Sequence, residues 1–323
     1  MKNDTPLISV AMTTYNGEKY ISEQIDSILN QTYKNIEIII CDDCSTDNTI
    51  NILKEYEKKY NNIKIYLNES NIGLNNNFEK AIKNCNGEYI AISDQDDIWN
   101  RNKLELLINN IENYDVICSK KIDIGNNNEI LQDIHIKSFE YAKKFKYNKY
   151  DFLNMFFTNI LWGCTSLSKK TFLINCMPFP TEKNFCYDHW LCINAYVNES
   201  LKYIDDVTLM HRIHYSNVTR SLNLGNPYIR WIKKLNKRNI ENQYIALINQ
   251  IDFILLRIHL NEDYKQIITD MKEIYESILN FKFSKKDFQL LQKEFILYKK
   301  INRRFIFIIK SIAERIILTF LPN

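Results

Sequence analysis

Short apolar runs alternate with amphipathic segments through the first 120 residues, and this regularity restricts the fold more than any other feature. The apolar runs have the length of strands and lie at Leu7–Met12, Ile36–Cys41, Ile63–Leu67, Glu88–Ser93 and Asp115–Ser119. Between them, residues 21–29, 45–59, 74–84 and 100–113 carry a helical pattern. Strands that are almost wholly apolar are typical of a sheet that helices cover on both faces. The alternation therefore predicts an α/β fold with a mostly parallel sheet.

Polar and acidic side chains follow three of these expected strands directly. They lie in Thr13-Thr14-Tyr15, in Asp42-Asp43 and in Ser93-Asp94-Gln95-Asp96-Asp97-Ile98-Trp99. Ligands of parallel sheets bind beyond the carboxyl ends of the strands, where these residues are expected. Three carboxylates within four residues repel one another unless a cation lies among them. One interpretation is a divalent cation that carries a phosphorylated ligand. The other is a solvated acidic turn that caps the helix starting near Asn100.

Composition excludes several classes of protein. The 323 residues, 45% hydrophobic and 25% charged, suit one large α/β domain with a smaller appendage. A net charge of +3 and the lack of a recognition motif argue against a nucleic-acid partner. The N-terminus has no signal-peptide core, so we expect a cytoplasmic, reducing location for the eight cysteines. Two carboxylates between Cys41 and Cys44 argue against a redox pair, because they would raise rather than lower a thiol pKa.

The pattern is less regular after residue 122. We expect a loop or flap over 122–149, a strand over 161–168, a helix over 187–198 and a strand over 207–214. Asp188 lies at the start of the expected helix. The last expected strand ends in the first residues of the motif His211-Arg212-Ile213-His214-Tyr215-Ser216-Asn217. Each group has a structural alternative, since Asp is a common helix cap and a strand His is often a core residue.

The three strand-end motifs, taken together, resemble the nucleotide-binding half of the family 2 glycosyltransferases. The order, spacing and placement of Thr13–Gly17, Cys41–Thr49 and Ser93–Trp99 match, and the resemblance covers about residues 6–220. Around Trp99 the chain is most similar to bacterial rhamnosyltransferase-like members. The resemblance implies a GT-A fold, in which helices flank a Rossmann-like, mostly parallel mixed sheet. It implies a catalytic domain over 1–225, with a nucleotide-binding half at about 1–120 and an acceptor and catalytic half at 121–225.

The resemblance also implies which residues bind the nucleotide of the donor. Asp43 would accept a hydrogen bond from the nucleobase, while Thr13 and Tyr15 would line the pocket for base and ribose. The family usually has glycine at the position of Cys44. A left-handed backbone at that position would therefore be strained in this chain.

A metal site and a diphosphate site follow from the same resemblance. Asp94 and Asp96 match the family's DxD element, so Asp96 would bind Mn²⁺ or Mg²⁺ while Asp94 would contact the ribose or a metal-bound water. His214 would be a further metal ligand. Arg212 would neutralise the diphosphate and Asn217 would hydrogen-bond to it.

Asp188 matches the family's general base, which removes the proton of the acceptor hydroxyl. The chain is thus expected to be a metal-dependent inverting glycosyltransferase. Its donor would be a dTDP- or UDP-sugar, and its acceptor a glycan or lipid-linked glycan of the bacterial surface, in a polysaccharide, lipopolysaccharide or glycoprotein. The alternatives are a non-catalytic sugar-nucleotide or glycan-binding module and a nucleotidyltransferase. The Thr13–Gly17 turn lacks the basic, glycine-rich phosphate loop that a nucleotidyltransferase would be expected to carry.

Residues 226–323 change in character to long amphipathic helices with basic surfaces. Basic and aromatic residues cluster near residues 228–238, and a second basic group interrupts an apolar run near the C-terminus. Three interpretations stay open for this helical region: a contact with the inner face of the membrane, a homodimer interface, or packing on the catalytic domain. Charges at Lys310, Glu314 and Arg315 argue against a membrane span over 305–321.

Overall fold

The computed structural model describes residues 5–131, 140–157, 159–181, 185–214 and 237–280. The chain divides into two compact units. The first comprises residues 1–146 and 158–222, and the second comprises residues 147–157 and 223–323. Residues 147–157 therefore cluster with the C-terminal helices, although they lie inside the segment that the sequence assigned to the catalytic domain.

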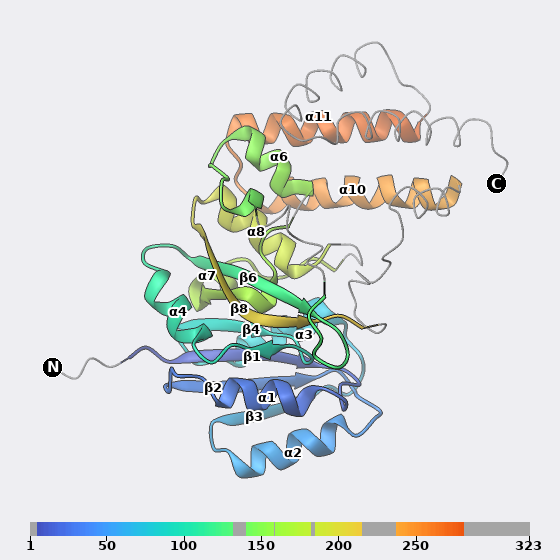
Figure 1. Cartoon of the computed structure of the whole chain (residues 1–323). Coiled ribbons are helices and arrows are strands. Elements are labelled where there is room, and N and C mark those ends of the chain that lie inside the picture. Colours follow the sequence, from blue (N-terminus) through green and yellow to red (C-terminus); the bar gives the residue numbers. More distant parts are fainter. Residues whose placement is uncertain (1–4, 132–139, 158, 182–184, 215–236, 281–323) are drawn as a thin grey trace. The chain divides into compact units, whose positions relative to one another are not determined.

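An eight-stranded sheet forms the centre of the first unit, in the order β3-β2-β1-β4-β7-β6-β8-β5 (Figure 1). The strands are β1 Ile8–Thr14, β2 Ile36–Asp42, β3 Ile63–Leu67, β4 Tyr89–Ser93, β5 Ile98–Trp99, β6 Val116–Ile124, β7 Ser166–Lys169 and β8 Leu201–Arg212. β1, β2, β3 and β4 pair in parallel, as do β6 and β8, while β7 and β5 run antiparallel to their neighbours. The predicted mixed sheet is confirmed.

The register of the parallel strands brings the polar strand ends to one edge. Thr14 lies opposite Asp42, and Asp42 lies opposite Leu67 on the next strand. On the other side of β1, Met12 lies opposite Ser93. The side chains that follow these residues therefore meet beyond a single edge of the sheet.

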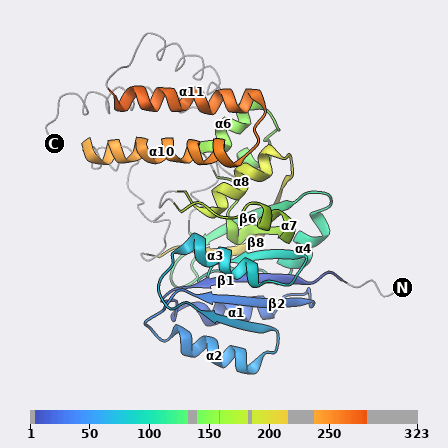
Figure 2. The same cartoon turned by 180° about the vertical axis from the view of Figure 1, so that it is seen from behind.

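Four helices connect the strands of the nucleotide-binding half: α1 Ile21–Leu29, α2 Thr49–Lys59, α3 Leu74–Asn84 and α4 Lys103–Asn110. α1 and α3 cover opposite faces of the sheet, as the two opposite views show (Figures 1 and 2). Ile25 and Ile28 of α1 are fully buried, and so are Phe78 and Ile82 of α3. Since both faces are covered, the strands can be apolar on both sides, which explains their unbroken runs of isoleucine.

The second half of this unit is more ordered than its sequence indicated. β6 continues to Ile124, into the stretch expected to be a loop, and two register shifts near Lys120 bend its pairing with β8. The strand expected over 161–168 is a 3₁₀ turn at Gly163–Thr165 (η1) followed by β7. A short helix, α7 Lys170–Asn175, follows, and α8 Tyr187–Val197 matches its predicted bounds closely.

The described part of the second unit consists of three helices, α6 Lys149–Phe157, α10 Lys237–Arg257 and α11 Glu262–Leu279. Phe152 of α6 stacks on Tyr264 of α11, with ring centroids 4.3 Å apart, and Tyr244 of α10 contacts Tyr275 of α11 at 5.4 Å. Within the residues described, no helix is both long and apolar enough to cross a membrane. The two basic clusters and the apolar C-terminal run lie outside the described residues, apart from Lys237 and Arg238 at the start of α10.

Candidate active site

Asp42 holds the turn between β2 and α2. Its carboxylate is fully buried and accepts hydrogen bonds from the Thr14 hydroxyl (2.7 Å), the Ser45 backbone N–H (2.8 Å) and the Ser45 hydroxyl (2.6 Å). These three hydrogen bonds join the ends of β1 and β2. They engage the carboxylate within the protein, so Asp43 rather than Asp42 is the candidate for ligand binding.

Asp43 lies at the edge of a cavity and organises the loop before α3. Its Oδ1 accepts from the Asn68 side chain (2.9 Å) and the Ile72 N–H (2.8 Å), and its Oδ2 accepts from the Gly73 N–H (3.0 Å). A carboxylate has about four acceptor positions, so capacity for one more donor remains. These contacts leave Asp43 able to accept a hydrogen bond from a nucleobase N–H, and they exclude it as a cap of α2.

Cys44 has a left-handed backbone, with φ at +67°. This is the conformation that the family's glycine would adopt freely, and for a residue with a Cβ it costs about 1–2 kcal/mol. Asp42 and Ser45 flank Cys44 in the chain, and the hydrogen bonds between them hold the turn in place. Cysteine in place of the family's usual glycine therefore leaves the turn intact but strained.

Gln95 fastens the first motif to the acidic loop, a role that the sequence did not suggest. Its Oε1 accepts from the Tyr15 N–H (2.9 Å) and its Nε2 donates to the Tyr15 carbonyl (3.1 Å). Gly17 packs so closely on this amide that any Cβ at position 17 would collide with it. Glycine at this position therefore leaves room for the Gln95 amide to bond to Tyr15.

The acidic loop between β4 and β5 is not a helix cap. α4 begins at Lys103, its N-cap is Asn102, and no side chain caps it. Asp96 and Asp97 are instead buried, with 9% and 1% of their surfaces exposed. Asp97 Oδ1 accepts from the Arg212 N–H (3.1 Å), whereas its Oδ2 has no hydrogen-bond partner among the described residues. The capping interpretation of the cluster is wrong.

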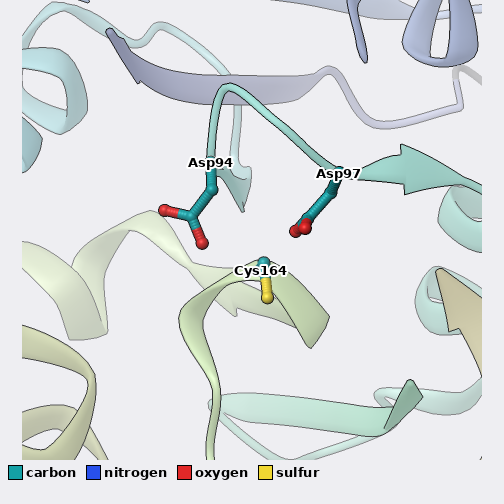
Figure 3. A group of neighbouring side chains, drawn as sticks. All are labelled: Asp94, Asp97 and Cys164. Atoms are coloured by element: carbon teal, nitrogen blue, oxygen red, sulfur yellow. The ribbon is translucent and has the colours of Figure 1, made fainter. Parts of the chain in front are cut away.

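Asp94, Asp97 and Cys164 form one possible cation site. Figure 3 shows the two carboxylates directed from the loop toward Cys164 of η1, and one ligand atom of each residue lies within 4.8 Å of the others. Burial, followed by repulsion from Asp97, Asp96 and Asp188, raises the pKa of Asp94 well above its usual value. Burial also raises the pKa of the Cys164 thiol, which makes it a poor ligand because only the thiolate binds metal well.

Asp96 and His214 form a second group, although 118 residues separate them in the chain. Asp96 Oδ2 lies 2.8 Å from His214 Nε2, and the imidazole stacks on Tyr20 with ring centroids 5.1 Å apart. The structure thus brings together the two residues that the sequence proposed as metal ligands. A carboxylate and an imidazole form a donor set that suits Mn²⁺.

Arg212 is buried, with 1% of its surface exposed, and does not line the cavity. Its guanidinium donates to the carbonyls of Asp96 (2.9 Å) and Gly125 (3.1 Å), to Asn128 Oδ1 (2.6 Å) and to Glu23 Oε2 (2.8 Å). These bonds occupy the donors that a diphosphate would need. Arg212 therefore positions the acidic loop in this structure, and Asn217 lies outside the described residues.

Asp188 lies in the first turn of α8 and faces the same cavity as Asp43 and Asp94. Burial raises its pKa to about 6, although hydrogen bonds from the His189 and Gly163 N–H groups and from Asn159 oppose the shift. The carboxylate is therefore ionised at neutral pH and is a stronger base than an exposed aspartate. That is the property a general base needs.

Lys103 is a second residue that sequence reasoning missed. It is fully buried, its Nζ donates to the Cys164 carbonyl, and it lies 3.5 Å from the centroid of the Trp99 ring. Burial lowers its pKa to about 7, while Asp97 and Asp94 oppose that shift. In its protonated form the lysine lowers the pKa of Asp94 and so offsets part of the repulsion among the acids.

One cavity of about 380 Å³ joins these groups. Of the predicted site residues it is lined by Thr13, Tyr15, Asp43, Asp94, Asp96 and Asp188. A volume of this order is typical of a small-molecule site. The nucleotide-binding motifs and the candidate base therefore share one pocket. Arg212 and His214 do not line it, but His214 contacts Asp96, which does.

The mixed α/β sheet, with strand-end acids lining one pocket, has the architecture of the GT-A fold. The model of the glycosyl transferase family 2 matches residues 9–173. The chain belongs to this family and is a glycosyltransferase, which confirms the resemblance seen in its motifs.

Two curated relatives and one solved structure illustrate the proteins that are similar to this chain. The UDP-Glc:alpha-D-GlcNAc-diphosphoundecaprenol beta-1,3-glucosyltransferase WfgD of Escherichia coli is 36% identical over 199 residues, which are 59% of this chain and 70% of WfgD. The dTDP-rhamnosyl transferase RfbG of Shigella flexneri is 33% identical over 223 residues, 64% of this chain and 72% of RfbG. The S. aureus TarS 1-349 structure in complex with UDP-GlcNAc has a TM-score of 0.61 at 20% identity and is matched over 98% of this chain and 91% of TarS, which supports the fold.

Proposed function

We propose that this enzyme is a metal-dependent inverting glycosyltransferase that moves a sugar from a nucleoside diphosphate to a hydroxyl of a bacterial surface glycan. The observation that carries the proposal is the position of Asp188. Its pKa is raised to about 6, and it faces the pocket that Asp43 and Asp94 line from the other half of the unit. A base of this strength opposite a donor site suits a single displacement at the anomeric carbon.

The described residues fit a divalent cation. Asp96 and His214 would hold Mn²⁺ or Mg²⁺, with Asp94 in reach of the ribose or of a metal-bound water. The cation would offset the charge of the departing diphosphate. Burial contributes most to the raised pKa of Asp94, and repulsion from Asp97 and Asp96 adds to it; a bound cation would relieve this repulsion, which supports the placement. The Asp94, Asp97 and Cys164 group suits Mn²⁺ or Mg²⁺ less well, because these hard cations prefer oxygen ligands to the soft sulfur of a cysteine.

Donor binding is assigned to the motif residues. Thr13 and Tyr15 would flank the base and ribose, and Asp43 would accept from the imide N–H of uracil or thymine through its remaining acceptor position. WfgD is named for UDP-Glc and RfbG for dTDP-rhamnosyl transfer, and the TarS structure is a complex with UDP-GlcNAc, which supports a UDP- or dTDP-sugar here.

The acceptor proposed is a glycan or lipid-linked glycan, by analogy with the diphosphoundecaprenol substrate in the name of WfgD. Such a substrate would place the enzyme at the inner face of the cell membrane as a peripheral protein. The helical region 226–323 would provide that contact or a homodimer interface, through basic residues of which most lie outside the described part of the chain.

The test is the Asp188→Asn variant, assayed with a panel of UDP- and dTDP-sugars in the presence of Mn²⁺. We expect transfer to fall by about 100-fold or more, because an amide cannot accept the hydroxyl proton, while the donor dissociation constant changes little. The control is Asp206→Asn, which removes an exposed carboxylate of β8. Near-normal turnover of the Asp188 variant would refute the assignment of the base.

A further inference from the structure

A buried charged cluster lies on β6 and β8, apart from the motifs that define the family. Lys121 Nζ lies 2.6 Å from Asp123 Oδ1, and His211 Nδ1 lies 2.9 Å from both of these atoms. The side chains of Lys121 and Asp123 are each 1% exposed, whereas that of His211 is 15% exposed. Asp123 and His211 are direct partners across the two strands. The sheet register therefore places the cluster.

The cluster orients the imidazole of His211. Hydrogen bonds from Lys121 and His211 lower the pKa of Asp123 to about 2, although burial opposes this shift, so the acid stays ionised. Asp123 Oδ1 and Lys121 Nζ both contact the same ring nitrogen, Nδ1, at 2.9 Å, so these two contacts fix the orientation of the ring. The other ring nitrogen, Nε2, takes no part in either contact, and it can bond to a hydroxyl in either tautomer because a hydroxyl both donates and accepts.

His211 and Trp162 together reach the cavity from this cluster. Both line the pocket, next to the stretch formed by Gly163, Cys164 and Asp188. Lys121 Nζ lies 5.5 Å from the centroid of the Trp162 ring and 2.9 Å from His211 Nδ1, so one buried ammonium supports both side chains. Asp123 and Lys121 do not line the pocket themselves.

We propose that Trp162 and His211 form the subsite for the hexose ring that this enzyme transfers, an inference that rests on the proposed function. An aromatic face packs against the C–H groups of a sugar ring, and an oriented imidazole nitrogen binds one ring hydroxyl. The nucleobase would lie beside Thr13 and Asp43, and the diphosphate beside Asp94 and Asp96, all of which line the same pocket.

Charge favours a hydroxyl over a phosphate as the partner of His211. The ammonium of Lys121 and the carboxylate of Asp123 neutralise each other at 2.6 Å, so this buried pair adds no net charge behind His211. A site that recognises phosphate would carry a net positive charge. A site built to bond one hydroxyl discriminates strongly between sugars that differ at that carbon, because the unpaired polar group is costly. The cluster would thus set which hexose is accepted.

The test compares binding of a sugar nucleotide with binding of its nucleoside diphosphate. Calorimetry with Mn²⁺ would use UDP-glucose, UDP-N-acetylglucosamine and dTDP-rhamnose, and then UDP and dTDP alone. For the sugar nucleotide that binds best, His211→Phe should weaken binding by about tenfold while the matching diphosphate changes by less than about twofold. Trp162→Ala should give the same split without disturbing the buried ion pair, and Trp162→Phe should largely restore binding.

Every outcome bears on the inference. Three results would overturn the subsite while the proposed function stands. His211→Phe could leave the binding of every ligand unchanged, or it could weaken the free diphosphate as much as the sugar nucleotide. It could also change only the KM of the acceptor. His259→Phe, at an exposed site in the second unit, controls for loss of a histidine. If the unsubstituted enzyme binds none of these nucleotides, the proposed function fails and the subsite fails with it.

Discussion

Replacing Asp188 by asparagine should stabilise the protein as it removes activity. In the folded protein burial raises the pKa of Asp188 to about 6, from an ordinary value of 3.8. Protonation therefore favours the folded state, and stability is lost as the pH rises through about 6 and the buried group ionises. Asparagine carries no charge and avoids this penalty.

The magnitude follows from the shift. About two pKa units at 1.36 kcal/mol per unit give a ceiling of roughly 3 kcal/mol at pH 7.5. Asp188 also faces the pocket, where water screens its charge, so between about 1 and 3 kcal/mol is expected. At pH 5 the advantage should fall to roughly half, because most of the folded wild type is then already protonated.

The assay is thermal unfolding of both proteins in EDTA at pH 7.5 and pH 5, since a bound cation would itself shift the pKa of Asp188. The variant should melt about 3–8 °C higher at pH 7.5, with a smaller difference at pH 5. Asp206→Asn should show no such pH-dependent gain, because that carboxylate is exposed. A variant that melts lower at both pH values would refute the claim that a buried charge is being relieved.

Three further predictions test other parts of the pocket. Asp96→Asn should raise the midpoint of a Mn²⁺ titration, followed by donor binding, by at least about tenfold, and an unchanged midpoint would exclude it as a ligand. Cys44→Gly should stabilise the protein against urea by up to about 1 kcal/mol, because glycine relieves the left-handed backbone; destabilisation would show that the thiol packs usefully. Asp43→Ala should lose about 2 kcal/mol of stability together with nucleotide affinity, and Asp43→Asn less of both, as measured by urea unfolding and calorimetry; equal losses would contradict the role of its two oxygens.

The nucleotide-binding half could be predicted because its information is local. Apolar runs of strand length and helical periodicity located β1 to β4, and a parallel sheet requires their polar ends to share one edge. Asp43 and Asp94 are adjacent to strand ends, so their meeting in one pocket followed from topology alone. The prediction that Asp188 belongs to the same site came from the family resemblance, because hydrophobic periodicity describes only local segments and cannot relate residues so far apart.

Other features depend on contacts that no periodicity reports. The partnership of Asp123 with His211 needs the register of β6 on β8, which shifts twice near Lys120. Lys103 begins a helix, where a charged residue is ordinarily solvated, yet it lies fully buried on Trp99. An arginine in a motif associated with diphosphate binding gave no sign that it would instead bond to the carbonyl of Asp96.

The acids of the β4–β5 loop have different roles. Asp94 and Asp96 line the pocket, whereas Asp97 turns inward and accepts from the backbone of Arg212. Arg212, which lies two residues before His214 in the chain, donates to the Asp96 carbonyl. This hydrogen bond joins β8 to the acidic loop. Asp97 and Arg212 therefore set the position of Asp96 relative to His214, and the proposed metal site depends on this inward contact as much as on the residues that would bind the cation.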